Sequence, residues 1–463
     1  MTRDSAETRT IESRTTRSPV EVPAQDSSAA DATCSTREPG ARDLIETYLR
    51  VRTDTDRLAS RLSDEDLAVQ VRTEASPVKW HLAHTTWFFE TFILEKHEPG
   101  FEPFHDDFRV LFNSYYNAVG KQHPRHLRGA LTRPSAECVR GYRHATDERV
   151  LRLLAASDAE ALAQLGPTID IGLHHEQQHQ ELILTDLKLL LSFNPLYPAY
   201  IDFAVTLPTP PPSASPAFID FKDGLTEIGH DVRTDTFAYD NESPRHKVWL
   251  EPFALADRLV TNNEYQQFID DGGYDRAELW LSEGWAAVQE HGWRAPAYWT
   301  THNNSQHEFT LAGLVPLQPD APVLHVSFYE ADAYARWRAL QDPGVRLPTE
   351  CEWEHAAAQQ GITDARAHVL DNAAHNTASD GPLYQLTGAA WQWTGSAYRP
   401  YPGYCPPPGA LGEYNGKFMV SQHVLRGGSL ATPPGHTRVT YRNFFHPSAR
   451  WQYAGVRLAR DAR

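Results

Sequence analysis

Cysteine is scarce in this 463-residue chain, which has only four. No pair among Cys34, Cys138, Cys351 and Cys405 has the spacing of a metal site or of a redox motif. This scattered pattern is typical of a reduced protein and not of a disulfide framework, so we expect a cytoplasmic location. Any bound metal must then be held by carboxylates or by the 22 histidines.

Long apolar runs and an excess of positive charge are lacking as well. The chain has no run of about eighteen apolar residues and no apolar signal segment near its N-terminus, which argues against a membrane span and a secretion signal. The formal net charge of −17 disfavours nucleic acid and anionic membrane surfaces as partners. We therefore expect neither nucleic acid nor a membrane as a partner.

The first half of the chain has the pattern of a helix bundle. Residues 1–40 are rich in Ser, Thr, Ala and Arg, with almost no large apolar residues, and predict a disordered tail. Four amphipathic patterns follow within 41–205, with one long connection at about 97–134. They predict helices over 44–62, 78–97, 136–156 and 169–193. Such a bundle can hold a metal site in its interior.

A proline-rich segment at 206–216 predicts a linker. Beyond it, residues 217–463 are dense in Gly, Pro, Trp and Tyr, with short apolar runs and few long helical patterns. This composition and these short apolar runs predict an α+β domain of short strands, many loops and a few helices. The expected fold class is therefore multidomain, with an α domain followed by an α+β domain.

Histidines cluster in two of the predicted bundle helices. His175 and His179 are four residues apart, so they share a helix face, whereas His174 lies about 100° round the helix. His81 and His84 on the second helix are three residues apart, and one of them is enough to complete a site. Three neutral imidazoles suit a divalent metal that binds substrate or dioxygen. Spacing alone leaves open a surface pair or a hydrogen-bonded core pair instead.

Several longer motifs occur in order along the chain. They read HLAH at 81–84, HHEQQHQE at 174–181, RLPTECEWEHAA at 346–357, GAAWQWTGSAY at 388–398, LRGGSLAT at 425–432 and AGVRLAR at 454–460. Together they resemble the ergothioneine-biosynthesis sulfoxide synthases, over nearly everything from residue 43 to 460. The resemblance implies a DinB-like four-helix bundle followed by a C-type-lectin-like domain of the formylglycine-generating-enzyme (sulfatase-modifying-factor) type.

The resemblance also implies a non-haem Fe(II) centre. Carried over residue by residue, its ligands are His84, His175 and His179. His81 and His174 are then left with supporting or structural roles. Gln178, beside a ligand, matches the position that helps to hold the histidine-derived substrate of the family.

The loop between the second and third helices carries further candidates. Tyr115 and Tyr116 resemble a tyrosine pair in one branch of the family, where a phenol donates a proton and steers the chemistry away from thiol dioxygenation. A phenol with a pKa near ~10 stays protonated at neutral pH, as this role requires. An aromatic pair that plugs one end of the bundle is the alternative. Arg125 and Arg128 are candidates for bidentate hydrogen bonding to a substrate carboxylate; the alternative is that they are ordinary surface cations.

The segment RNFF at 442–445 resembles the stretch that receives the trimethylammonium and carboxylate groups of hercynine, N-α-trimethylhistidine. Phe444 and Phe445 offer aromatic faces for a quaternary ammonium, and Asn443 offers a hydrogen bond to the carboxylate. Without the resemblance, core phenylalanines at the end of a strand are the default interpretation.

We therefore expect a non-haem iron oxidoreductase, an Fe(II)- and O2-dependent sulfoxide synthase that joins a thiol to the imidazole carbon of hercynine. The sulfur donor is cysteine or γ-glutamylcysteine, and the tyrosine pair favours cysteine. Alternatives are an ovothiol-type 5-histidylcysteine sulfoxide synthase, a thiol dioxygenase, a zinc or nickel thiol transferase and a non-catalytic binding module. The region expected to hold the cysteine pair of formylglycine-generating enzymes has none, and we see no room before Arg463 for the methyltransferase domain of ovothiol-type synthases.

The helical spacing makes a direct prediction for the two adjacent histidines. His175→Ala should abolish metal binding, whereas His174→Ala should largely keep it, because only His175 shares a face with His179. Iron content after anaerobic loading with Fe(II) measures the effect in both variants. Equal loss in the two would refute the assignment of the helix face.

Overall fold

The structure of the chain is a computed structural model, and it describes residues 40–202, 216–234, 236–361 and 381–462. The expected tail at 1–40 and the expected linker at 206–216 lie almost entirely outside the described residues. Both therefore stay predictions, as do the domain boundaries that they define.

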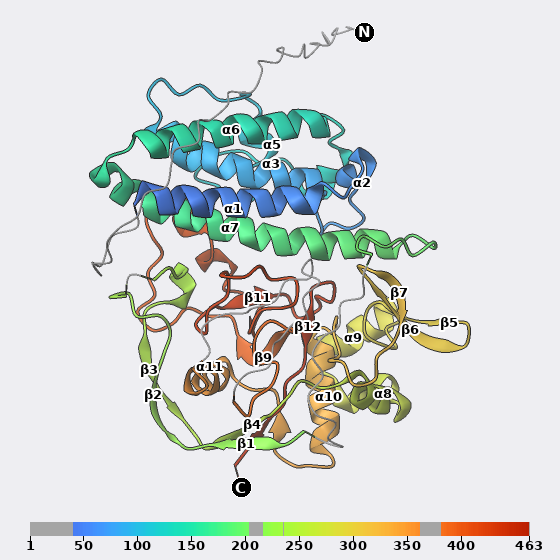
Figure 1. Ribbon diagram of the computed structural model, residues 1–463. Helices are drawn as coiled ribbons and strands as arrows, with labels where there is room; N and C mark the ends of the chain where they lie inside the picture. The colour runs from blue at the N-terminus through green and yellow to red at the C-terminus, as the bar shows by residue number, and fades with distance from the viewer. Residues whose placement is uncertain (1–39, 203–215, 235, 362–380, 463) are drawn as a thin grey trace, which may run out of the picture. The chain divides into compact units, whose positions relative to one another are not determined.

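Four long helices form the first part of the described chain: α1 (Ala41–Ala59), α3 (Val78–Phe89), α6 (Ala136–Ala156) and α7 (Ala159–Ser192). Helices α1 and α3 each pack against both α6 and α7, which closes a four-helix bundle (Figure 1). The connections carry the shorter elements α2 (Asp64–Ala68), a π-helical turn at Glu90–Leu94, α4 (Glu95–His97), α5 (Phe108–Leu111) and a 3₁₀ turn at Arg125–Ala130.

Helix α7 starts at Ala159, whereas the sequence pattern predicts a start at Ile169. Asp158 caps it, since its side chain accepts a hydrogen bond from a backbone N–H of the first turn at 2.9 Å. The helix then continues through Pro167, a residue that usually ends or kinks a helix. Leu165 and Ile169, on either side of this proline, are both buried in an apolar cluster with α1. Packing against the bundle thus outweighs the local penalty, and the expected boundary was wrong.

Helix α7 approaches α3 closely at Gly172. A Cβ atom at this position would lie 2.7 Å from a ring carbon of Phe89 and 2.8 Å from one of Phe88, too close to fit without a shift. Gly172 stands about one helical turn before His175, so the close approach places the histidine-bearing part of α7 directly against α3.

A buried ion network ties α7 to α1 and α6. The carboxylate of Glu176, which is fully buried, accepts hydrogen bonds from Arg52 Nη1 at 2.8 Å, Arg143 Nη2 at 2.6 Å and Thr55 Oγ1 at 2.6 Å. Burial raises the pKa of this carboxyl, but the guanidiniums of Arg143 and Arg52 outweigh that effect and bring it down to about 2. Glu176 is therefore an anion at neutral pH, and breaking the network would leave a buried charge uncompensated.

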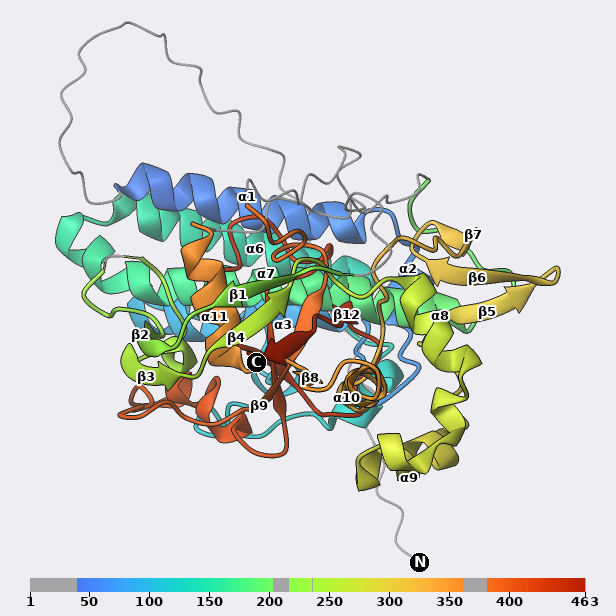
Figure 2. The ribbon, with the colours of Figure 1, turned by 90° about the horizontal axis from the view of Figure 1, so that it is seen from below.

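The second part of the chain is built from short strands. The described strands form four sheets, with the orders β1-β4-β13-β8, β11-β10-β9-β12, β2-β3 and β5-β6-β7. Figure 2 shows β5-β6-β7 and the hairpin β2-β3 at opposite edges of this part. The strands are β1 (Phe218–Phe221), β2 (Gly224–Ile228), β3 (His246–Leu250), β4 (Phe253–Ala256), β5 (Trp299–His302), β6 (Ser305–Thr310), β7 (Gly313–Pro316), β8 (Val345–Arg346), β9 (Trp391–Ala397), β10 (His423–Arg426), β11 (Asn443–Phe445), β12 (Ala454–Gly455) and β13 (Ala459–Asp461).

Helices accompany these sheets: α8 (Asn262–Asp270), α9 (Ser282–His291), α10 (Phe328–Ala339) and α11 (Glu350–Gln359). Helix α10 packs against β8 and β9, and α11 packs against β2, β4 and β10. The expected helix bundle followed by an α+β fold of short strands is therefore confirmed. None of the helices in the described ranges has the length and apolar content of a membrane span.

One side of α7 lies against the second part of the chain (Figure 1). Hydrogen bonds to that part start from α7 at His174, Gln177, Gln178, Glu181 and Lys188. Steps of three, four and seven residues keep side chains on one face of a helix. Helix α7 therefore has one face inside the bundle and another in the seam with the α+β part.

Candidate metal centre

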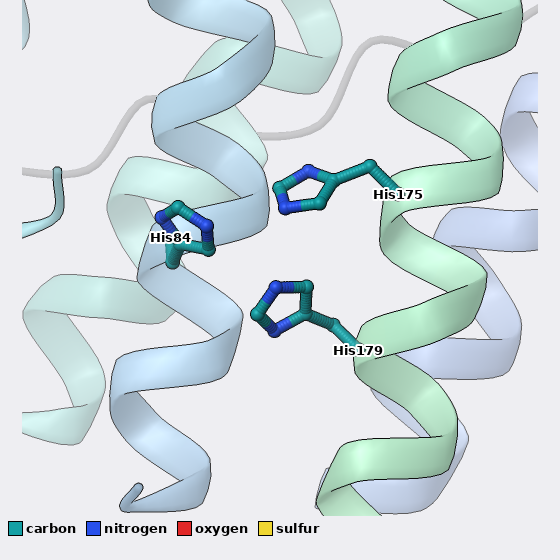
Figure 3. Close-up of side chains that lie close together, drawn as sticks. All are labelled: His84, His175 and His179. Atoms are coloured by element: carbon teal, nitrogen blue, oxygen red, sulfur yellow. The ribbon is translucent and has the colours of Figure 1, made fainter. Parts of the chain in front are cut away.

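Three buried histidines meet where α3 faces α7 inside the bundle (Figure 3). One ligand atom from each of His84, His175 and His179 lies within 4.8 Å of the other two. The three side chains are 0%, 1% and 7% exposed. The structure thus brings together the three residues that the resemblance implies, and they form a group that can hold a metal ion.

Hydrogen bonding decides which nitrogen His84 offers to this space. Its Nδ1 lies 2.6 Å from the carbonyl oxygen of Phe112, which only accepts, so Nδ1 carries the proton. The lone pair of the neutral ring is then on Nε2, a buried atom that has no hydrogen-bond partner among the described residues. Trp80 stacks on the imidazole with ring centroids 4.6 Å apart and helps to hold its plane.

A two-step relay of hydrogen bonds orients His179. Its Nδ1 lies 2.7 Å from Nδ1 of His81, and Nε2 of His81 lies 3.1 Å from a carboxylate oxygen of Asp186. Because the carboxylate accepts the proton of His81 Nε2, Nδ1 of His81 accepts from His179, and the lone pair of His179 is left on Nε2. The backbone N–H of Ser76 donates to the same Asp186 oxygen at 2.8 Å. His81 therefore supports a candidate ligand instead of competing with it.

All three imidazoles are neutral at physiological pH. Burial lowers the pKa of His175 to about 3. Burial, with a further contribution from the adjacent His175, lowers the pKa values of His84 and His179 well below their usual range. Neither nitrogen of His175 has a hydrogen-bond partner among the described residues, although both are buried. Unpaired buried polar atoms are uncommon in folded proteins, and unprotonated imidazole nitrogens are the form that binds metals.

The donor set fits a divalent metal that keeps open coordination positions. Imidazole ligands suit iron, zinc, copper and nickel, so the three histidines fit Fe(II) without selecting it over the others. Glu176, next to His175 along α7, is engaged by Arg52 and Arg143 and supplies no ligand. The site therefore has no protein carboxylate among its candidate ligands.

A cavity of about 170 Å³ is lined by Gln178, the residue before His179 on α7, and by no member of the histidine group. Tyr414, which lines it, has its ring centroid 5.7 Å from that of His175. Four candidates from the sequence also line this cavity, namely Tyr115, Gln178, Asn443 and Phe444. The bundle and the α+β part both contribute to its wall, so the cavity lies in the seam between them.

Two tyrosines hold the Gln178 amide at the cavity wall. Nε2 of Gln178 donates to Tyr441 Oη at 2.6 Å, and Tyr414 Oη donates to its Oε1. Tyr239 stacks on Tyr414, with centroids 5.2 Å apart and ring planes 10° apart. None of these three tyrosines was predicted from the sequence. The abundance of tyrosine in the second half of the chain was the one available signal, and it does not single out any of them.

The predicted tyrosine pair lies on the loop that follows α5. The rings of Tyr115 and Tyr116 stack with centroids 4.8 Å apart. Tyr116 is fully buried, and its Oη has no hydrogen-bond partner among the described residues. Its ring lies 5.5 Å from that of Trp87, which in turn stacks on His84 at 5.6 Å. Burial raises the pKa values of both phenols, so both keep their protons at neutral pH.

The remaining candidates do not line this cavity. Arg125 is exposed, and its guanidinium donates to the backbone carbonyl of Glu74. Arg128 is buried, with its guanidinium carbon 3.4 Å from the centroid of the Trp80 ring. Phe445 is partly buried and packs against the apolar core.

Comparisons with known proteins bear on this site. The sulfatase-modifying factor enzyme 1-like domain matches residues 205–382 and 370–462, and the DinB superfamily matches residues 47–183. A hercynine oxygenase of Mycolicibacterium smegmatis is 31% identical over 452 residues, which cover 91% of this chain and 99% of that protein. One of Mycobacterium tuberculosis is 32% identical over 435 residues, which cover 89% of this chain and 97% of that protein.

The chain belongs to the hercynine oxygenase family. This membership confirms the family expected from the motifs, and it makes the chain an oxygenase. A formylglycine-generating enzyme of Streptomyces coelicolor is 27% identical over 277 residues, which cover 50% of this chain and 85% of that enzyme. The histidine group lies within the residues that match the DinB superfamily, and the residues that line the seam cavity lie within the two matched domains.

The relay behind His179 predicts an effect of Asp186 on metal binding. We expect Asp186→Asn to weaken divalent-metal affinity by about 10–100-fold, because an amide no longer fixes His81 as the acceptor for His179 Nδ1. Competition between the protein and a chromophoric chelator for Co(II) or Fe(II) measures the affinity. Asp170→Asn, the same change on the same helix, serves as the control and should leave it unchanged. Equal affinity of Asp186→Asn and the unmodified protein would contradict the relay.

Proposed function

We propose that the chain is an Fe(II)- and O2-dependent sulfoxide synthase of ergothioneine biosynthesis. It joins the sulfur of a thiol to the imidazole carbon of hercynine, and cysteine is our first choice of thiol over γ-glutamylcysteine. One hercynine, one thiol and one O2 give one sulfoxide and one water: the C–H and S–H bonds are lost and a C–S and an S=O bond form. The observation that carries the proposal is the three-histidine group beside the cavity that holds Gln178 and Asn443.

The histidines serve as the ligands of the iron in this proposal. Bound there, Fe(II) supplies the redox chemistry and the open positions at which the reactants meet. His84 and His179 present Nε2, because the Phe112 carbonyl and His81 occupy their other nitrogens. Since these orientations exist before any ligand arrives, little reorganisation is needed when the site is loaded.

The seam cavity serves as the place for the hercynine side chain and its polar end. Gln178 and Asn443 offer amide groups for the carboxylate or the imidazole, and Phe444 offers an aromatic surface for the trimethylammonium group. Tyr414 and Tyr441 hold the Gln178 amide from both ends, so its position is fixed before the substrate binds. A rigid amide of this kind contributes selectivity through the hydrogen bonds that a wrong substrate would leave unmade.

The tyrosine pair serves as the proton source. Tyr116 Oη is buried, protonated and free of partners among the described residues, so its proton is available to an acceptor that arrives with the reactants. Tyr115 lines the cavity and stacks on Tyr116. A proton donated by this tyrosine pair while O2 is consumed favours C–S bond formation over oxidation of the thiol to a sulfinic acid.

Arg128 serves as the anchor for the carboxylate of the thiol substrate, with Arg125 as its neighbour. No carboxylate lies within ion-pair distance of Arg128 among the described residues, although its guanidinium is buried. Burial and the nearby Arg125 lower its pKa to about 9. A buried cation that lacks an anionic partner is costly, and a bound carboxylate removes this cost.

Oxygen consumption tests the proposed function directly. The protein is purified without oxygen, loaded with Fe(II), and mixed with hercynine and cysteine in oxygenated buffer. We expect O2 uptake that requires both substrates, in a ratio of one O2 per sulfoxide formed. Omission of either substrate, histidine in place of hercynine, and protein loaded with Zn(II) are the controls.

Each alternative gives a different result in this experiment. A thiol dioxygenase consumes O2 with cysteine alone, an ovothiol-type enzyme accepts histidine and forms the other ring isomer, and a thiol transferase or binding module consumes no O2. Uptake that does not depend on hercynine would overturn the proposal. Replacement of cysteine by γ-glutamylcysteine in the same assay identifies the preferred thiol.

The proton role of the tyrosines predicts a change in product ratio. Tyr116→Phe or Tyr115→Phe should raise the share of cysteine sulfinic acid relative to the sulfoxide, because the phenolic proton is missing when the oxygen is consumed. Mass spectrometry of both products after complete O2 uptake measures the ratio. Tyr142→Phe, which removes a buried hydroxyl bonded to Glu90 elsewhere in the bundle, is the control. An unchanged ratio in both site variants would remove the pair from the mechanism.

A further inference from the structure

We propose that Glu181 is a positioning residue for hercynine: it fixes α7 against the α+β part of the chain so that Gln178 stands at the right place in the substrate cavity. The inference rests on the proposed function for the identity of the substrate. Glu181 itself does not line the cavity and is not a candidate ligand of the metal. Its effect would be transmitted through the side chains that it holds.

Three donors of the α+β part converge on the carboxylate of Glu181. Oε1 accepts from Trp391 Nε1 at 2.7 Å and from Ser429 Oγ at 2.7 Å. Oε2 accepts from Thr432 Oγ1 at 2.8 Å. Glu181 is 9% exposed as a residue, and all three donor residues are buried. These partners come from two separate segments, so a single side chain of α7 binds β9 and the turn after β10 together.

The donors of Glu181 also shape the contact that holds Gln178. The Trp391 ring packs against Tyr441 with centroids 5.5 Å apart, and Tyr441 Oη accepts the hydrogen bond of Gln178 Nε2 at 2.6 Å. Gln178 and Glu181 are three residues apart, so they lie on the same side of α7 on successive turns. The four side chains close a ring: Glu181 holds Trp391, Trp391 supports Tyr441, and Tyr441 holds Gln178.

The donors around position 181 favour a carboxylate over an amide. Two hydroxyls and an indole N–H all point at the side chain, and an ionised carboxylate is the side chain that accepts at both ends and donates at neither. Glutamine has nearly the same shape, but its NH2 group would turn at least one hydroxyl from donor to acceptor and leave that O–H without its present partner. Ser429 and Thr432 are also tied to each other, because the backbone N–H of Ser429 donates to Thr432 Oγ1 at 2.8 Å. This turn therefore cannot easily rearrange to suit an amide.

No arginine or lysine is bonded to Glu181 among the described residues, so the carboxylate is not part of an ion pair. Its role differs in this respect from that of Glu176, which binds two arginines within the bundle. Glu176 orders the bundle internally, whereas Glu181 specifies how α7 meets the α+β part. If the bonds of Glu181 are lost, α7 can shift against the α+β part. Gln178 then moves relative to Asn443, while the three histidines keep their positions relative to one another within the bundle.

Steady-state kinetics of Glu181→Gln test this inference. We expect the KM for hercynine to rise about tenfold, with kcat changed by less than about twofold and with Co(II) affinity unchanged. Glu264→Gln is the matched control, because Glu264 is another buried carboxylate with several donors, at the start of α8 and outside the cavity. This control should lower the melting temperature without changing the KM for hercynine.

A double-mutant comparison separates positioning from general loosening of the fold. Trp391→Phe keeps an aromatic ring against Tyr441 and removes the N–H that donates to Glu181. It should therefore also raise the KM for hercynine, but by a smaller factor than Glu181→Gln does. In the double variant the two effects should be less than multiplicative, because both remove the same hydrogen bond. Trp391→Phe also keeps the inference testable if Glu181→Gln does not fold.

The outcomes distinguish this inference from the proposed function. Failure of the unmodified protein to use hercynine would overturn the proposed function, and the inference with it. Normal use of hercynine by the unmodified protein, with an unchanged KM in Glu181→Gln, would overturn the positioning role alone. A parallel loss of Co(II) affinity in Glu181→Gln would also overturn it, since the histidine group would then have moved as well.

Discussion

Helix α7 turns by about 100° per residue, so its neighbouring polar side chains must find partners in three directions at once. Glu176 points at the arginines of α1 and α6, His175 and His179 point at His84 on α3, and Glu181 points at the α+β part. Buried polar groups are costly unless they are paired. One rotation of the helix satisfies all three sets of partners, and the histidine group and the seam cavity both depend on this rotation.

The histidine group differs from these paired side chains because several of its buried nitrogens have no hydrogen-bond partner among the described residues. Around it, the Phe112 carbonyl is bonded to Nδ1 of His84 and His81 to Nδ1 of His179, while Asp186 is bonded to His81. The Nε2 atom of His84 and both nitrogens of His175 have no partner among the described residues. Because burial also keeps these rings neutral, the lone pairs stay available at any ordinary pH. The fold therefore orients the candidate ligands of a metal ion in advance.

The position of this site explains why two parts of the chain are needed. The candidate ligands come from the bundle, but most of the residues that line the cavity come from the α+β part, including Asn443 and Tyr414. Gln178 is the link, since it stands on the ligand-bearing helix and is held by tyrosines of the other part. The proposed reaction brings a thiol, hercynine and O2 together, and it gains most from fixed relative positions because ordering three reactants is an entropic cost.

Local patterns in the sequence were enough to predict the bundle and the paired histidines, because the spacing of His175 and His179 reflects helix geometry. The choice of His84 over His81 came from the family resemblance; in the structure it follows from Phe112, whose carbonyl is bonded to His84. Contacts between distant segments carried no local signal. Glu181 meets Trp391 across 210 positions of sequence, so its role became visible only in the folded chain.

The central claim is that the metal and hercynine meet at α7, between the histidine group and the seam cavity. A crystal structure of the protein loaded with Fe(II) and hercynine without oxygen, with anomalous scattering measured at the iron edge, tests it most directly. The account predicts an iron peak bonded to His84, His175 and His179, with hercynine in contact with Gln178 and Asn443. Iron at other residues, or hercynine bound outside this cavity, would contradict it.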